Sequence, residues 1–138
     1  MFSELNKYDN NGHFFFRKGK SLKELTKDVP DLPGVYYIIR LSGGSIDLVY
    51  IGKSGTIQQN GRFKDQGLKG RLNNKQDGTR REDFFNEMCL KENIDALDIY
   101  WFVTFDHKNQ DLPGFVEGTI MQRYFDVHGK LPVWNKTF

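Results

Sequence analysis

Residues 34–53 read GVYYIIRLSGGSIDLVYIGK, and this stretch decides the fold. Two apolar runs, residues 35–41 and 48–51, flank the polar turn Ser42-Gly43-Gly44-Ser45. Runs rich in β-branched and aromatic residues on either side of a glycine turn predict an antiparallel hairpin. With the turn centred near Gly43, we expect Tyr36 roughly opposite Tyr50, so that both side chains point to the same face.

Helix signals lie on both sides of the hairpin. Ser21 and Glu24 have the spacing of a capping box, which predicts a short helix that stops before Pro30. A final helix is expected to carry Pro113 in its first turn and to end at Gly129. Its apolar stripe would consist of Val116, Ile120, Tyr124 and Val127.

The remaining segments complete an α+β pattern. Residues 97–105 predict a third strand, residues 82–93 a helix, and a short helix is expected to carry Arg71. Residues 13–17 form a short apolar run consistent with an edge strand. We therefore predict a small three-stranded antiparallel sheet flanked by helices over residues 33–138. Residues 1–32 are expected to be an N-terminal extension, a short strand and helix packed on this domain.

Composition fits one globular domain. The chain has 138 residues, 38% of them hydrophobic and 28% charged, enough to bury a core without cross-links. Its apolar runs are far shorter than the ~20 residues of a membrane span. The first residues lack a signal-peptide pattern, and Cys89 is the single cysteine, which excludes an internal disulfide. We expect a cytoplasmic protein without membrane contact.

Charge is distributed unevenly. Residues 53–81 contain eight Lys or Arg against two Asp, a net charge of +6, whereas residues 82–119 have a net charge of −7. A basic block directly after the hairpin suits a polyanion. Alone, such a block is more often a solvated surface, so charge by itself does not assign a function.

Five sequence elements resemble the GIY-YIG nuclease family, over about residues 33–136. They follow the order that the family uses: Gly34-Val35-Tyr36, Tyr50-Ile51-Gly52-Lys53, Arg71 at a helix start, Glu117 in a later helix, and Asn135 near the C-terminus. Each residue alone has an ordinary explanation, as a strand aromatic, a loop lysine, a surface glutamate or a turn asparagine. Their joint occurrence in this order favours a nuclease fold.

The resemblance implies a metal and a phosphate clamp. Glu117 would be the ligand of Mg²⁺ (or Mn²⁺), which keeps most of its water molecules. Arg71 would hold a phosphate oxygen with its planar guanidinium. Asn135 would brace the site from behind.

The resemblance also implies a tyrosine base. Tyr50 is expected to act as general base, although a phenol with an ordinary pKa of ~10 is a weak base at neutral pH. A nearby cation favours the phenolate, so Lys53 is expected to lower the pKa of Tyr50. Tyr36 would orient the attacking water or a phosphate.

Two positions depart from the family pattern. The family commonly places its arginine closer to the second tyrosine, which makes Arg62 a rival to Arg71. We favour Arg71 because residues 68–72 resemble a helix start, whereas Arg62 lies among loop residues. Several branches carry a histidine four residues after the arginine, where this chain has Lys75, or Gln66 if Arg62 is the counterpart. Proton removal would then fall to Tyr50 with Lys53.

We therefore expect a restriction-like or repair-like DNA endonuclease that leaves 5′-phosphate and 3′-hydroxyl ends. The substrate is expected to be double-stranded DNA, and cutting both strands would favour a homodimer. Amides in the 53–70 loop could read base edges: Gln58, Gln59, Asn60 and Gln66. The cations expected to contact DNA are Arg62, Lys64, Lys69, Lys75, Arg80 and Arg81. The alternative is a module of the same fold that binds nucleic acid without cutting it.

Overall fold

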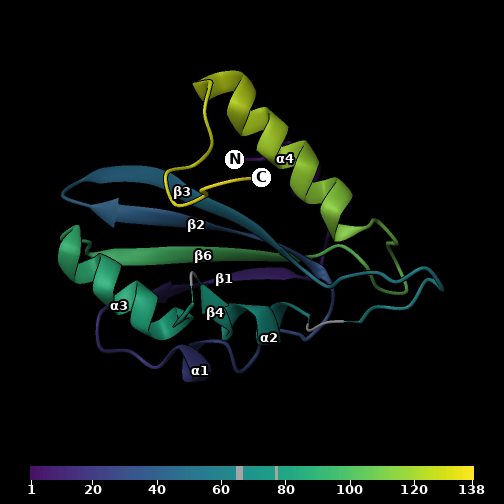
Figure 1. Cartoon of the computed structure of the whole chain (residues 1–138), viewed down its shortest axis with the longest axis horizontal. Helices are drawn as coiled ribbons and strands as arrows, with labels where there is room; N and C mark the ends of the chain where they lie inside the picture. The colour runs from purple at the N-terminus through teal and green to yellow at the C-terminus, as the bar shows by residue number, and fades with distance from the viewer. Residues whose placement is uncertain (65–66, 77) are drawn as a thin grey trace.

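The computed structural model describes residues 1–64, 67–76 and 78–138, and shows a sheet with helices on both faces (Figure 1). In chain order the elements are η1 (Ser3–Leu5), β1 (Asn11–Phe16), α1 (Leu22–Leu25), β2 (Gly34–Ser42), β3 (Ser45–Ser54), α2 (Leu68–Leu72), β4 (Lys75–Gln76), β5 (Thr79–Arg80), α3 (Arg81–Lys91), β6 (Ala96–Val103) and α4 (Pro113–His128). The α+β class is as predicted. Among the described residues, no helix combines the length and apolar character needed to cross a bilayer.

The main sheet has four strands in the order β1-β6-β2-β3, and every neighbouring pair is antiparallel. The prediction of three strands was wrong because the N-terminal run adds β1 to the free side of β6. The pairing extends from Asn11 opposite Phe102 to Phe16 opposite Leu97. It satisfies backbone donors and acceptors that β6 would otherwise expose. β3 is left as the opposite edge of the sheet.

The predicted hairpin is present, but its register differs from the expectation. Gly43 and Gly44 both have positive φ, 55° and 83°, as the favoured two-residue hairpin turn requires. The turn is therefore centred between them, and β3 gains one extra residue at a register shift next to Ile38. Tyr36 consequently lies opposite Gly52, and Tyr50 lies opposite Ile38. The two tyrosines still share a face, because their partners are two residues apart.

Each face of the sheet has its own core. One face packs against α1, α2 and α3, and its buried residues include Phe16, Tyr36, Leu72, Phe85 and Leu97. The other face packs against the N-terminal residues and α4, and its buried residues include Leu5, Val35, Tyr37, Val116 and Ile120. Figure 1 shows α4 on one side of the sheet and α1, α2 and α3 on the other. Residues on α2 and on α4 are thus separated by the sheet except at its edges.

The helix ends follow their sequence signals. Ser21 caps α1 by accepting a hydrogen bond from the amide of Glu24 (3.3 Å), and Pro113 opens α4. Gly129 ends α4 in the left-handed conformation, with φ of 66°. Val127 is 78% exposed, so its assignment to the apolar stripe of α4 was wrong. The last turn of α4 borders an open pocket instead of the sheet.

Gly52 has no room for a side chain. A Cβ at this position would lie 2.6 Å from Cζ and 2.7 Å from the hydroxyl oxygen of Tyr36, and 2.9 Å from Cε1 of Tyr50. The absence of a side chain therefore allows the two tyrosine rings to pack over β3. Sterics thus account for the glycine that follows Tyr50-Ile51.

We expect Gly52→Ala to lower the free energy of unfolding by about 1–3 kcal/mol, because the rings must shift to admit the methyl group. Gly118→Ala is the control, since its Cβ would come no closer than 3.9 Å to Cζ of Phe138. Within α4 this control should be neutral or stabilising. Urea unfolding of the three proteins measures both effects. Equal stability of Gly52→Ala and the wild type would contradict the steric account.

Candidate functional site

A cleft of about 560 Å³ opens at the outer edge of β3. The helices on the two faces of the sheet both contribute to it: Arg71 comes from α2 and Glu117 from α4. Tyr50 and Lys53 come from β3 itself. The complete lining is Tyr50, Gly52, Lys53, Ser54, Gly55, Thr56, Lys64, Arg71, Asn74 and Glu117. Four of the six residues that the sequence predicted to be catalytic therefore line one cavity.

Tyr36 lies beneath this cleft and is fully buried. Its ring centroid is 6.0 Å from that of Tyr50. Its hydroxyl oxygen accepts a hydrogen bond from Nη1 of Arg81 (2.7 Å). Since Tyr36 does not line the cleft, its geometry fits support of Tyr50 better than direct contact with a substrate.

Arg81 is a candidate for a role in the site that the sequence analysis did not predict. It was expected among the cations that contact DNA, but its side chain is 1% exposed. Its guanidinium carbon lies 5.4 Å from the ring centroid of Tyr36 and 5.9 Å from that of Tyr50. Its Nε has no hydrogen-bond partner among the described residues. Arg81 therefore carries a positive charge inside the domain, beside the two tyrosines.

The backbone explains why Arg81 points inward. β4 and β5 pair as a short antiparallel ladder, and the amide of Arg81 then donates to the carbonyl of Asn74 (3.0 Å). This contact fixes the first residue of α3 against the end of α2. The sequence signal for an inward-pointing Arg81 would have been Gly78, which favours a turn three residues before the start of α3.

Burial raises the pKa of Tyr50 to about 12, and the neighbouring phenol of Tyr36 acts in the same direction. The cations that oppose this shift are Arg81 and Arg71. Lys53, which was expected to favour the phenolate of Tyr50, instead lowers the pKa of Glu117. The register gives the reason, because Lys53 pairs with Val35 on the face covered by α4, whereas Tyr50 points to the opposite face.

Glu117 is a half-buried carboxylate between two cations. Burial raises its pKa, and the charges of Lys53 and Arg71 lower it without cancelling the effect of burial. Among the described residues, no group of three or more His, Cys, Asp or Glu side chains is arranged to hold a metal. One carboxylate does not make a zinc cage. It does suit a Mg²⁺ ion that keeps most of its water and also contacts a phosphate.

Asn135 fixes the C-terminal tail along the edge of β3. Its Oδ1 accepts from the amide of Ile51 (3.0 Å), and its Nδ2 donates to the carbonyl of the same residue (2.9 Å). The amide of Trp134 donates to the carbonyl of Val49 (2.9 Å). The asparagine side chain thus replaces a neighbouring strand beside Tyr50, a geometry in keeping with the expected bracing role.

The two rival arginines lie in different surroundings. Arg71 lines the cleft and acts on the pKa of both Tyr50 and Glu117. Arg62 is exposed in a turn where its amide donates to Oδ1 of Asn60 (3.0 Å), and it does not line the cleft. The geometry therefore favours Arg71 as the arginine of the site.

The other cations expected to contact DNA are dispersed around the cleft. Lys64 lines it, Lys69 is half-buried on α2, and Lys75 is exposed on β4. Arg80 is exposed but forms an ion pair with Asp83 (2.9 Å). Of the amides expected to read bases, Gln58, Gln59 and Asn60 are exposed, and Gln66 lies outside the described residues.

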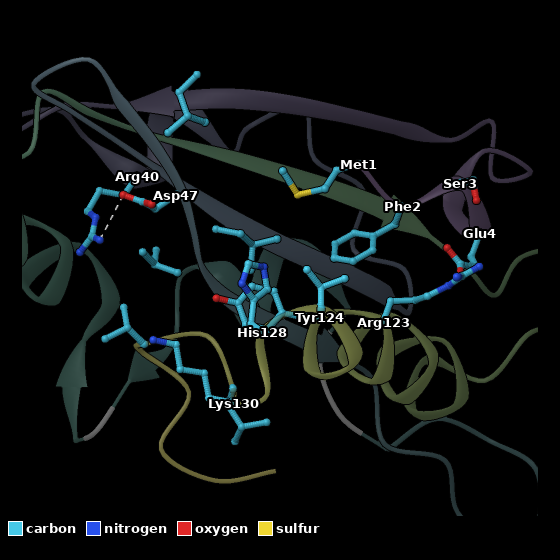
Figure 2. A pocket seen from close by; sticks show the side chains of 16 residues that line it. Met1, Phe2, Ser3, Glu4, Arg40, Asp47, Arg123, Tyr124, His128 and Lys130 are labelled. Carbon is cyan, nitrogen blue, oxygen red and sulfur yellow. Dashed lines mark hydrogen bonds and ion pairs between the residues drawn. The ribbon is translucent and has the colours of Figure 1, made fainter.

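A larger pocket of about 730 Å³ lies between the N-terminal residues and the last turns of α4 (Figure 2). None of the predicted site residues lines it. Two of its cations are neutralised within the pocket, Arg40 by Asp47 (3.3 Å) and Arg123 by Glu4. Size alone does not assign a function, so the cleft at β3 is the better candidate.

No family model matches this chain, and neither does any curated protein or any solved structure. The geometry of the cleft and the order of the motifs along the chain are therefore the basis for assigning a function.

We expect Glu117→Gln to change the pH dependence of stability. The pKa of Glu117 is raised in the folded protein, so folding favours its protonated form. The contribution of Glu117 to stability should be greatest below the ordinary pKa of glutamate and should fall as the pH rises through the raised pKa. The Gln variant lacks this loss, so it should become more stable than the wild type as the pH rises from ~3 to ~8.

Urea unfolding across this pH range, in the presence of a chelator, makes the measurement. Glu87→Gln is the control, because Glu87 is exposed on α3 and its substitution should leave the pH profile unchanged. If the difference in the free energy of unfolding between the wild type and Glu117→Gln does not vary with pH, Glu117 is not desolvated.

Proposed function

We propose that this chain is a divalent-metal-dependent endonuclease that hydrolyses phosphodiester bonds in double-stranded DNA. The observation that carries the proposal is the meeting of Tyr50, Arg71 and Glu117 in one cleft at the β3 edge. The order of the motifs along the chain supports the same conclusion. A binding surface alone would not need a desolvated carboxylate between two cations.

The basic side chains of the cleft suit a phosphate. Arg71 is exposed at the cleft, and its guanidinium can donate two parallel hydrogen bonds to phosphate oxygens. Lys53 and Lys64 add positive charge on either side. These three cations would hold the reacting phosphate and offset the charge that develops on it.

Tyr50 is the candidate base. With its pKa raised to about 12, it keeps its proton in the free protein at neutral pH. It can orient a water molecule through its hydroxyl. Positive charge added to the cleft would lower its pKa, so that Tyr50 releases its proton to solvent and the phenolate can then accept a proton from the attacking water. Arg81 beneath the ring is already positioned to stabilise the resulting phenolate.

Glu117 is the residue that would hold Mg²⁺. The ion would supply the charge that neutralises the phosphate and lowers the pKa of nearby acids, including water. The charge of Lys53 lowers the pKa of Glu117 and so favours the ionised carboxylate that a metal ion needs. Asn135 would keep Tyr50 in place through the backbone of Ile51.

We expect the protein to nick supercoiled plasmid DNA with Mg²⁺ or Mn²⁺ and to lose this activity in a chelator. Arg71→Gln and Glu117→Gln should each reduce the rate at saturating DNA by roughly 100-fold or more, because each removes a charge that acts on the transition state. Arg62→Gln is the matched control and should stay within about threefold of the wild type, since Arg62 lies outside the cleft.

The same samples are tested for DNA binding by gel shift. Cleavage that depends on Arg62 and not on Arg71 would contradict the assignment of the arginine. Salt-dependent binding by a protein that never cuts would contradict hydrolysis and would favour the alternative, a nucleic-acid-binding module of the same fold.

A further inference from the structure

A second, smaller pocket shares Tyr50 and Arg71 with the cleft already described. Its volume is about 210 Å³, below the roughly 300–1,000 Å³ of typical small-molecule sites. It lies among β4, the start of α3 and the C-terminal tail. Its lining is Tyr50, Arg71, Lys75, Gln76, Arg81, Trp134, Asn135, Lys136 and Thr137.

The charges around this pocket have one sign. Among its described lining residues, four are Lys or Arg and none is Asp or Glu. The cleft, by contrast, contains the carboxylate of Glu117. A pocket lined by cations and uncharged side chains, without a carboxylate, is unfavourable for a metal ion and suits an anion.

Two buried polar groups beside the pocket are incompletely satisfied. Nε of Arg81, a donor, lacks a hydrogen-bond partner among the described residues and could donate to an anion; Oε1 of Gln76 also lacks one there, but it is an acceptor and does not favour an anion. Arg81 is 1% exposed and donates to a neutral phenol, Tyr36, and it forms no ion pair with a described carboxylate. A buried cation without a counter-charge is costly, and an anion in the adjacent pocket would offset that cost.

We propose that this pocket binds a second phosphate group, next to the phosphodiester held in the cleft. The small volume suits a phosphate better than a whole nucleotide. That the phosphate belongs to a nucleic-acid strand rests on the proposed function, whereas the phosphate site itself does not. Arg71, which lines both cavities, would lie between two successive phosphates of one strand.

This arrangement constrains the path of the strand. The two cavities share Tyr50 and Arg71 in their linings, so successive phosphates would pass over these two residues at the edge of β3. Asn135 and Trp134 form the wall along which the strand would run. A substrate with only one phosphate would occupy only one of the two cavities.

The experiment is a titration followed by the NMR amide signals of the protein in a chelator, at constant ionic strength. The probe is inorganic phosphate, with chloride as the reference anion. Phosphate should shift the signals of Gln76, Arg81 and Asn135 and should saturate. Lys75→Gln should weaken its binding about fivefold, because one cation is removed. Lys91→Gln is the matched control, since Lys91 is exposed at the other end of α3, about 15 Å away.

A second titration compares the dinucleotide TpT with its 5′-phosphorylated form, pTpT. Tighter binding of pTpT than of TpT and of inorganic phosphate, with the gain lost in Lys75→Gln, would support a strand phosphate. Binding of pTpT no tighter than that of inorganic phosphate would overturn the strand assignment and indicate a site for free phosphate. Shifts that chloride reproduces, or that Lys75→Gln and Lys91→Gln reduce equally, would overturn the site altogether.

The test of the phosphate site and the test of nuclease activity can succeed or fail independently. Saturable phosphate binding at Gln76 and Arg81 in a protein that cuts no DNA would support the site and refute hydrolysis. Cleavage of DNA by a protein whose pocket binds no phosphate would do the reverse.

Discussion

The candidate site can form only at the outer edge of β3, because elsewhere the sheet keeps the side chains of its two faces apart. A sheet separates the side chains of helices on its two faces, and in this fold α2 and α3 lie on one face and α4 on the other. Only past the last strand can Arg71 and Glu117 reach the same cavity. An open strand edge is also a place where chains pair wrongly. Asn135 covers part of it by bonding both backbone groups of Ile51, which leaves the adjacent stretch of β3 to form the cleft.

Burial gives the site its electrostatic character. It raises the pKa of both Tyr50 and Glu117, so burial opposes the ionisation of both acids. Arg81 and Arg71 oppose this from the side of the tyrosines, and Lys53 opposes it from the side of α4. Of these two acids, Arg81 thus acts on Tyr50 alone and Lys53 on Glu117 alone, whereas Arg71 acts on both. A ligand that adds or neutralises charge in the cleft would change both ionisations together, because they share Arg71.

The sequence predicted those features that depend on local chemistry. Alternating β-branched and aromatic residues around Gly43-Gly44 predicted the hairpin, and Pro113 and Gly129 predicted the limits of α4. Features set by tertiary pairing were missed. The run at residues 13–17 was expected to be an edge strand, but its place as a fourth strand of the main sheet depends on β6 having a free edge. The tyrosine register depends on one extra residue in β3. Burial of Arg81 depends on the β4–β5 ladder, whereas a sequence alone suggests an ordinary surface arginine.

Side chains from opposite faces of the sheet surround one cleft, and the central claim is that this cleft binds the proposed divalent cation. Paramagnetic broadening of the amide signals by substoichiometric Mn²⁺ tests it without requiring cleavage. The account predicts that broadening appears together around Glu117 on α4, Gly52 to Ser54 on β3 and Arg71 on α2, and that it disappears in Glu117→Gln. Broadening confined to one face of the sheet, or unchanged by that substitution, would contradict it.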